Sequence, residues 1–144
     1  MIIDCFDGEF AFLSNFYEQP HFITDEMGIS YITVEHYFQA SKSMDSAVRK
    51  RISILETPGK AKRAGRSVDL RPDWEEVKVN VMRTALIKKF SDPLMKAKLL
   101  ETGDAELVEG NWWGDKFWGV CDDEGANHLG KLLMEIRETF KGIG

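Results

Sequence analysis

Apolar residues at helical spacing dominate the chain after residue 33. In "VEHYFQASK", Val34, Tyr37 and Phe38 recur on one face of a helix, and Thr33 is placed to cap its first turn. Start and stop signals of the same kind bound the later helices. The pattern predicts helices from Thr33, from Asp45 to the "TPG" turn, from Pro58 to Gly65, from Asp73 to about Phe90, from Pro93 to Gly103, and along the apolar stripe of Leu129, Leu132, Leu133, Ile136 and Phe140.

The segment before the first helix has the composition of short strands. "FAFLSNFYEQPHFITDEMGISYIT" mixes aromatic and β-branched residues around a Met-Gly turn, which favours antiparallel pairing. A further short strand is expected in "AELVEG". No repeat, low-complexity tract or linker interrupts the chain, so we expect a single domain over residues 1–144. The predicted fold class is α+β, a mostly helical domain with a small antiparallel sheet.

Residues 109–119, "EGNWWGDKFWG", hold three of the four tryptophans, three glycines and one aspartate, Asp115. Glycines this dense disfavour helix and strand, so we expect a loop that brings flat rings and a carboxylate close together. That is the composition of a binding pocket. The alternative is a hairpin whose indoles fill the core, which is the more common arrangement for any single tryptophan.

Composition excludes several classes of protein. Hydrophobic residues make up 43% and charged residues 30%, which is typical of a globular chain and not of a disordered one. No apolar run has the length of a membrane span, and "MIIDCFDGEF" lacks the regions of a secretion signal, so we expect a cytoplasmic protein. Cys5 and Cys121 lie far apart, and the three histidines have no zinc-type spacing. We therefore expect reduced thiols and no structural metal.

One segment departs from the acidic balance of the chain. The formal net charge is −5, but residues 49–71 contain eight basic and two acidic residues, a local charge of +6 against −11 for the remainder. Such a basic surface could bind a phosphate-bearing ligand. The alternative is a solvated helix face, which a run of charges does not exclude.

The helix of "VEHYFQASK" also carries candidate catalytic groups. Glu35 and Lys42 lie nearly two helical turns apart, with Gln39 between them on the same side. We expect this side to lie at the boundary of the core, where partial burial suits a glutamate to proton transfer. The alternative, which periodicity alone favours, is an exposed glutamate and lysine on an amphipathic helix.

An ordered set of motifs resembles the NADAR, or YbiA-like, family and covers nearly the whole chain. The motifs are "FLSNFY" (residues 12–17), "TVEHYFQASK" (33–42), "GKAKRAGR" (59–66), "RPDWEEVK" (71–78), "LVEGNWWGDKFWG" (107–119) and "GANHLGKLLMEIR" (125–137). The resemblance implies a YbiA-like fold and a cofactor-independent N-glycosidase. Its implied substrates are phosphorylated ribosylamino intermediates of riboflavin synthesis or ADP-ribose attached to guanine.

By motif, the resemblance implies functional roles for Glu35 of "VEHYF", Trp74 of "PDW" and Asp115 of "WGD". Cleavage builds positive charge on the ribose, which one carboxylate can stabilise while another group protonates the leaving amine or activates water. Glu35 and Asp115 can divide these roles. Lys42, if unprotonated, could instead attack C1 of an opened sugar as a Schiff-base nucleophile, which we rank second. The indole-rich "NWWGDKFWG" departs from the family pattern and affects the expected shape of the base pocket.

The expected substrate-binding residues follow from the groups that such substrates carry. A phosphate requires cationic donors, a heterocycle requires a flat surface, and a ribose requires hydrogen-bonding groups. Trp74 could instead pack the start of its helix, and Asn15 could be a turn residue at the end of a strand. The candidates are Lys60, Arg63 and Arg66 for the phosphate, Asn15 for a ribose hydroxyl, and Phe16, Trp74 and Trp113 as further substrate-binding residues with aromatic rings.

We therefore expect a hydrolase that cleaves the bond between ribose C1 and an exocyclic amine of a base. Its partner is a small nucleotide-like molecule, with ADP-ribosylated guanine in nucleic acid as one form, and no membrane or obligate protein partner is implied. The alternative is a non-catalytic module that binds ADP-ribose or a nucleotide. The presence of both Glu35 and Asp115 argues against it.

Overall fold

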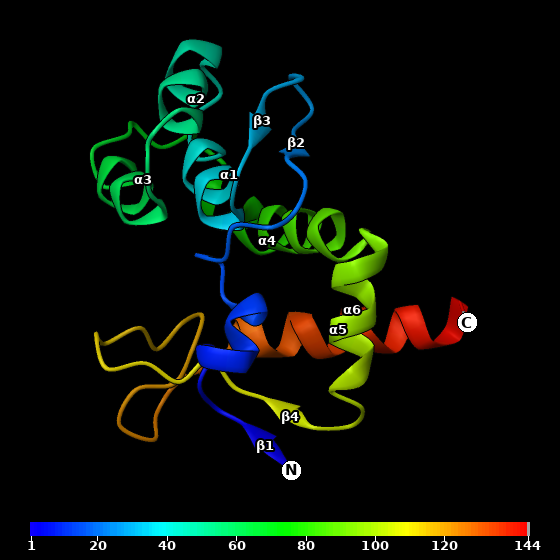
Figure 1. Ribbon diagram of the computed structural model, residues 1–144. Helices are drawn as coiled ribbons and strands as arrows, with labels where there is room; N and C mark the ends of the chain where they lie inside the picture. Colours follow the sequence, from blue (N-terminus) through cyan, green and yellow to red (C-terminus); the bar gives the residue numbers. More distant parts are fainter. Residues whose placement is uncertain (144) are drawn as a thin grey trace. The chain divides into compact units, whose positions relative to one another are not determined.

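Helices form most of the regular structure of the computed structural model, which describes residues 1–143 (Figure 1). Over this range there are six α-helices, one 3-10 helix and four short strands, so the prediction of a mostly helical fold with a small antiparallel sheet is confirmed. The elements are β1 (Ile2–Ile3), η1 (Gly8–Leu13), β2 (Ile23–Thr24), β3 (Ser30–Tyr31), α1 (Val34–Ala40), α2 (Ser46–Ser53), α3 (Pro58–Gly65), α4 (Trp74–Phe90), α5 (Pro93–Glu101), β4 (Glu106–Leu107) and α6 (His128–Ile143).

The chain folds into two compact units. Residues 1–14 and 90–144 form one, the terminal unit, and residues 15–89 form the other, the central unit. Each contains its own set of buried apolar side chains. The expectation of one domain over residues 1–144 stays a prediction.

In the terminal unit, the start of the chain pairs with β4. The pairing of β1 with β4 is parallel, with Ile3 opposite Leu107. Helix α6 packs on β4 and on α5, and all five residues of its predicted apolar stripe are buried. The strand expected in "AELVEG" is present as β4, and its partner β1 runs parallel to it.

The strand prediction is wrong for residues 10–13, which belong to the 3-10 helix η1 (Gly8–Leu13). Gly8 begins this helix with a φ of +54°, a conformation that favours glycine. Phe12 and Leu13 are both buried. A strand would direct these consecutive side chains to opposite faces, whereas the helical turn buries both.

The antiparallel hairpin lies in the central unit. β2 pairs with β3, with Ile23 opposite Tyr31. The expected Met-Gly turn is found between them, and Gly28 has a φ of +80°. Asp25 stabilises the turn because its Oδ1 accepts hydrogen bonds from the N–H groups of Met27 (2.9 Å) and Ile29 (3.0 Å).

A buried ion pair joins this hairpin to α2. Asp25 Oδ2 accepts hydrogen bonds from the Tyr31 hydroxyl (2.7 Å) and from Arg49 Nη1 (3.0 Å). Glu26 Oε1 lies 2.6 Å from the same Nη1. The side chains of Asp25 and Arg49 are fully buried, so each charge depends on the other for its stability.

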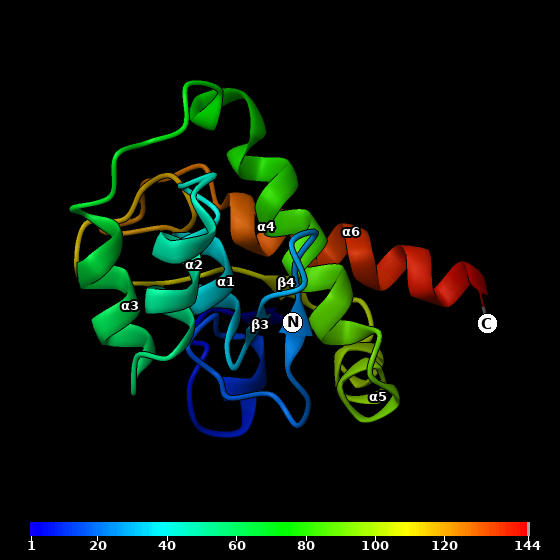
Figure 2. The same ribbon diagram turned by 90° about the horizontal axis from the view of Figure 1, so that it is seen from above.

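Helix α1 is the centre of the central unit. Thr33 caps it as predicted, by accepting a hydrogen bond from the N–H of His36 (3.1 Å). The helices α2 and α3 lie beside α1 in both ribbon views, and β3 also contacts it (Figure 1, Figure 2). Every residue of α1 is consequently buried. An amphipathic α1 with an exposed polar face is therefore excluded.

The other predicted helix starts are largely confirmed. The Thr57 hydroxyl caps α3, and Asp92 caps α5 by accepting from the N–H of Met95 (3.0 Å). Asp73 stands just before α4, as expected. Its carboxylate, however, accepts from Nε (2.6 Å) and Nη2 (3.1 Å) of Arg71.

Candidate functional site

Glu35 is a buried carboxylate in the first turn of α1. Its residue is 6% exposed, although nothing in the periodicity of the sequence requires burial there. The Glu35 N–H donates to the main-chain carbonyl of Asn15 (3.1 Å), which ties the preceding loop to the start of α1. One turn later, the Gln39 amide donates to Glu35 Oε1 (2.8 Å). A residue of the same helix therefore holds the Glu35 carboxylate in place.

Lys42 lies just beyond the end of α1 and close enough to Glu35 to interact with it electrostatically. Burial lowers the pKa of Lys42, the attraction of Glu35 opposes this, and the repulsion of Arg66 lowers it further, so that the net shift is downward. The Lys42 ammonium is 3.5 Å from the main-chain oxygen of Gly65, the last residue of α3. These groups of α1 and α3 therefore form one cluster within the central unit.

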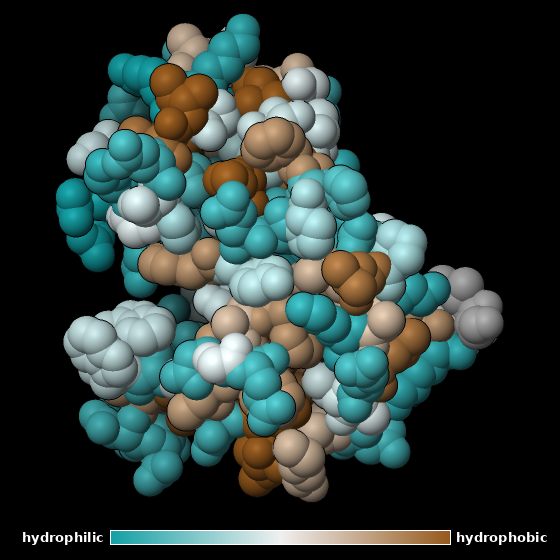
Figure 3. All heavy atoms as spheres, viewed as in Figure 1, coloured by the Kyte–Doolittle hydropathy of each residue, from teal (hydrophilic) through white to brown (hydrophobic). Residues whose placement is uncertain are grey.

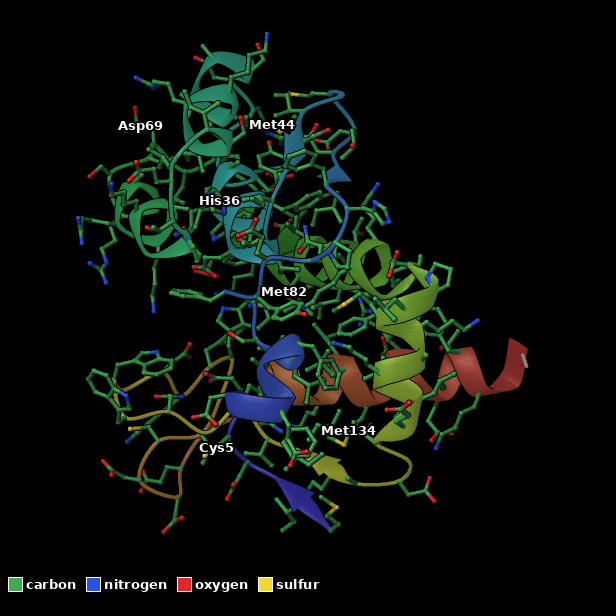
Figure 4. The ribbon with its side chains drawn as sticks, viewed as in Figure 1. Cys5, His36, Met44, Asp69, Met82 and Met134 are labelled. Atoms are coloured by element: carbon green, nitrogen blue, oxygen red, sulfur yellow. The ribbon has the colours of Figure 1, made fainter. Side chains whose placement is uncertain are left out.

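Asn15 and Phe16 lie on the segment that leads toward the hairpin. The Asn15 amide is 3.6 Å from the sulfur of Met82 on α4, where Figure 4 labels the methionine. The side-chain oxygen of Asn15 is buried and accepts no hydrogen bond from the described part of the chain. Phe16 is 44% exposed, and the ammonium of Lys62 lies 5.9 Å from its ring centroid. This segment thus presents a hydrogen-bond acceptor and an accessible aromatic ring.

The three predicted phosphate-binding cations are all exposed on or beside α3. Hydrophilic side chains gather over this helix in Figure 3. Lys60 forms an ion pair with Glu56 (2.8 Å), whereas the side chains of Arg63 and Arg66 form no ion pair within residues 1–142. The two arginines are thus better placed than Lys60 to receive an anion.

Trp74 is a buried residue at the start of α4. It is 6% exposed, and its ring lies 5.0 Å from that of Phe38 between centroids, in a tilted arrangement. Phe38 belongs to α1, one turn from Glu35. The packing alternative for Trp74 accounts for these contacts, and a role against the base stays a prediction.

Asp115 belongs to the loop between β4 and α6 in the terminal unit, and its carboxylate shapes that loop. Its Oδ1 accepts from the N–H groups of Phe117 (3.1 Å) and Trp118 (2.9 Å). Asn111 supports the same turn, since its amide donates to the Asp115 carbonyl (2.8 Å) and its Oδ1 accepts from the Asp115 N–H (3.0 Å). The described residues donate no hydrogen bond to Asp115 Oδ2.

The indoles of this loop are not core residues. Trp112 is 86% exposed and Trp113 49% exposed, and their rings meet edge to face with centroids 5.6 Å apart. Trp118 is half-buried and lies beside Phe117 (4.8 Å) and His128 (6.3 Å). The hairpin with three indoles in the core is therefore excluded, and the loop prediction is confirmed.

The glycines of this loop have two different functions. Gly114 has a φ of +89°, a left-handed conformation that favours glycine, so it provides a sharp turn in the loop. Gly110 and Gly119 are required by close approach instead. A Cβ at Gly110 would lie 2.2 Å from the main-chain oxygen of Asp4, and one at Gly119 would lie 1.8 Å from Glu109 Oε2.

Neither a metal site nor a membrane span is found in the part of the chain that the structure describes. No three His, Cys, Asp or Glu side chains gather there into a group that could hold a metal ion. No helix within residues 1–143 is both long and apolar enough to cross a bilayer.

Two buried polar residues of the central unit were not assigned a function from the sequence. Gln39 was seen only as a neighbour of Glu35 on the helix, and its polar character at a buried position is the signal that could have singled it out. Lys89 is also buried, which lowers its pKa to about 7, and its ammonium lies 5.6 Å from the ring of Tyr17. Its place in the last turn of a helix gave no sign of this burial.

Comparison with known proteins identifies the family. The sequence model of the NADAR domain matches residues 5–141. The chain is 43% identical over 120 residues to the N-glycosidase Npun_R5314 of Nostoc punctiforme, covering 78% of this chain and 76% of that protein. It is 44% identical over 120 residues to the N-glycosidase YbiA of Escherichia coli K12, covering 78% and 72%. It is also 39% identical over 140 residues to the riboflavin biosynthesis protein VVA0006 of Vibrio vulnificus, covering 94% of this chain and 37% of that protein.

A solved structure supports the same assignment at the level of the fold. The NMR structure of the E. coli protein YbiA matches 99% of this chain and 86% of its own, with a TM-score of 0.83 and 39% sequence identity. The family match, the sequence identities and the fold agree with the motif order along the chain. The chain belongs to the NADAR domain family.

Proposed function

We propose that this protein is an N-glycosidase that hydrolyses the bond between ribose C1 and an exocyclic amine of a base. Its substrate is either a phosphorylated ribosylamino intermediate of riboflavin synthesis or ADP-ribosylated guanine, because both carry this bond together with a phosphorylated ribose. The observation that carries the proposal is the buried Glu35 carboxylate, which is hydrogen-bonded by Gln39 and interacts electrostatically with Lys42.

The surroundings of Glu35 support a sugar as the ligand. Asn15 is joined to Glu35 through the main chain, and its side-chain oxygen is a buried acceptor without a donor within the described residues. A buried acceptor that lacks a partner costs free energy, on the order of 1–3 kcal/mol. A ribose hydroxyl is a donor that could satisfy it. This supports the assignment of Asn15 to the ribose.

In the proposed reaction, Glu35 acts at the anomeric carbon. As the C1–N bond breaks, positive charge develops on the ribose, and an anionic carboxylate stabilises it. The exocyclic nitrogen receives a proton and leaves as a free amine. Water adds to C1 and gives up one of its two protons to a base. Asp115 is the second carboxylate that the family motif assigns to this chemistry, and its Oδ2 is available for it.

Lys42 offers a covalent alternative. Because burial favours its neutral form, a larger fraction of this amine is nucleophilic than for an exposed lysine. It would attack C1 of the opened sugar and release the base, and water would then hydrolyse the resulting imine. Borohydride reduces an imine to a stable amine, so a sugar adduct trapped on Lys42 would support this route over direct hydrolysis.

Binding of the remaining substrate groups is assigned to further candidate residues. Arg63 and Arg66 are exposed cations that could bind the phosphate. Phe16 presents an accessible ring for stacking on the base. Trp113, which is half exposed, stays a candidate for the same purpose on the loop of the terminal unit.

A product assay on both substrate types tests the proposal. Purified protein is incubated in parallel with a phosphorylated ribosylamino pyrimidine and with an ADP-ribosylated guanine oligonucleotide. Release of free base and of a reducing sugar from at least one of them is expected. Tight binding of ADP-ribose without any product would contradict the proposal and would indicate a non-catalytic binding module.

A further inference from the structure

Gln39 makes a contact with Glu35 that the proposed reaction does not yet use. We propose that Gln39 is the positioning residue of Glu35, and that Gly65 is the residue that makes room for it. This inference rests on the proposed function, since it concerns the same carboxylate. It assigns Gln39 no contact with the substrate.

The hydrogen bonds of Gln39 serve Glu35 alone. Its side-chain amide donates to Glu35 Oε1 (2.8 Å), while its side-chain oxygen is buried and has no partner within residues 1–142. The residue is 6% exposed. A buried glutamine with an unsatisfied oxygen is less favourable for stability than an apolar residue of the same size. The polar side chain is therefore explained by what it does for Glu35.

Gly65 determines where the amide of Gln39 can lie. A Cβ at Gly65 would be 1.8 Å from the side-chain oxygen of Gln39 and 2.6 Å from its amide carbon. Gly65 is the last residue of α3 and its φ is not in the left-handed region, so its backbone does not require glycine. A larger residue at this position could be accommodated only if the Gln39 amide moved away. Gly65 of α3 therefore lies against the oxygen of the Gln39 amide, and Glu35 accepts a hydrogen bond from its nitrogen.

This arrangement has a chemical consequence for the carboxylate. An N–H donated to a carboxylate favours its ionised form, and it fixes the direction of the lone pairs on the other oxygen. Both effects favour stabilisation of positive charge at C1. They also predict that the ionisation controlling turnover occurs at higher pH when Gln39 is removed.

Other charged groups act on α1 from its neighbours, and all remain in the variants proposed below. Glu35 attracts the Lys42 ammonium, and Arg66 at the end of α3 repels it. On the side of the hairpin and α2, Asp25, Glu26 and Arg49 act on Tyr37. Burial lowers the pKa of His36, and its two ring nitrogens lie within hydrogen-bond distance of the Thr33 hydroxyl and the carbonyl of Leu55.

The first test replaces Gln39 with methionine, which has a similar shape and no amide. We expect kcat to fall about 10- to 100-fold because Glu35 loses its fixed orientation, with little change in KM. The acidic limb of the pH–kcat profile should move up by about one pH unit. The melting temperature should stay equal or rise. A fall in kcat that comes with lower stability and an unmoved acidic limb would show a purely structural role and overturn the proposal.

The second test is a double-mutant cycle with Gly65→Ala. In the wild-type background the new methyl group displaces the Gln39 amide, so kcat should fall about as far as in Gln39→Met. In a Gln39→Ala background the amide is absent, and Gly65→Ala should add less than a twofold loss. Losses that multiply in the double variant would show that Gly65 acts independently of Gln39 and would overturn its assigned role.

A titration that does not depend on turnover separates this inference from the proposed function. The Glu35 carboxyl carbon can be followed by ¹³C NMR, with its signal assigned by its absence in Glu35→Gln. Its titration midpoint should be higher in Gln39→Met than in wild type. An unchanged midpoint overturns the inference even if the enzyme is active. Absence of product release by the wild-type protein instead overturns the proposed function, whatever the midpoint.

Discussion

Asp25 and Asp115 both accept hydrogen bonds from backbone N–H groups, but their other contacts differ. Asp25 uses both carboxylate oxygens within the central unit, and Oδ2 binds Tyr31 and Arg49. Asp115 uses only Oδ1 to hold its loop. At the residue scale, the contacts of Asp25 show a structural role, whereas a catalytic role for Asp115 stays a prediction.

Asp25 predicts how stability depends on pH. Burial raises the pKa of Asp25, but the hydrogen bonds from Tyr31, Ile29, Met27 and Arg49 outweigh it, so the net pKa lies below the ordinary value of 3.8. The folded state therefore gains stability from this group at neutral pH and loses it as the pH falls below about 4. Asp25→Asn should be less stable at pH 7 by about 3 kcal/mol, because a buried arginine loses a partner. Urea unfolding at pH 7 and pH 3 measures both effects, and an equal pH dependence in the two proteins would contradict them.

For Asp115, the asparagine variant separates charge from loop structure. Asp115→Asn keeps an oxygen that can accept from the N–H groups of Phe117 and Trp118, so the loop should retain its conformation. The negative charge is lost, and we expect cleavage to fall on the order of 10²-fold with substrate binding retained. Single-turnover rates and equilibrium binding test this. Normal turnover in the variant would mean that Asp115 only shapes the loop.

At the scale of the elements, capping residues predict where helices begin. The burial of a helix depends on contacts with distant parts of the chain, which the sequence pattern does not show. The caps at Thr33 and Asp92 satisfy N–H groups within one turn, so they can be read from neighbouring residues. The burial of α1 on every side comes from α2, α3 and β3, which lie elsewhere along the chain. The alternative of an exposed Glu35 was therefore wrong, although the helix itself was predicted correctly.

Helix α3 allows a controlled test of phosphate binding. Arg63→Gln and Arg66→Gln should each raise KM several-fold and reduce its dependence on salt, because each removes a cation that could bind the phosphate. Lys60→Gln is the matched control on the same helix, and it should have a smaller effect because Lys60 pairs with Glu56. Melting temperatures should change little in all three. Equal KM values for all three variants and wild type at low salt would mean that α3 does not bind the phosphate and is only a solvated face.

At the scale of the whole molecule, motif order was more informative than composition. Composition predicted a globular chain and a basic segment, but only the order of six weak motifs indicated the family that the comparisons identify. The parallel pairing of β1 with β4 was missed because it joins the start of the chain to a strand after α5, and two-residue strands leave almost no pattern. The roles of the candidate site residues stay predictions.

The division into two units permits a test of the expected single domain. Trp74 is the tryptophan of the central unit, and the other three lie in the terminal unit. In Trp74→Phe, fluorescence therefore reports on the terminal unit, while far-ultraviolet circular dichroism reports on the helices of both. One domain predicts denaturation curves with the same midpoint by both probes. Two separate midpoints would mean that the units unfold independently.

The central claim is that Glu35 carries out the chemistry at ribose C1, and Glu35→Gln tests it most directly. Glutamine is nearly isosteric and keeps an oxygen toward the Gln39 amide, so the fold should be retained. It cannot carry the negative charge or exchange the proton, so turnover should fall on the order of 10²-fold or more. The decisive measurement is the rate of free-base release by wild type and by Glu35→Gln at equal folded concentration, on whichever substrate the wild type cleaves. A loss of this size in a folded variant is the predicted result, and near-normal release would contradict the account.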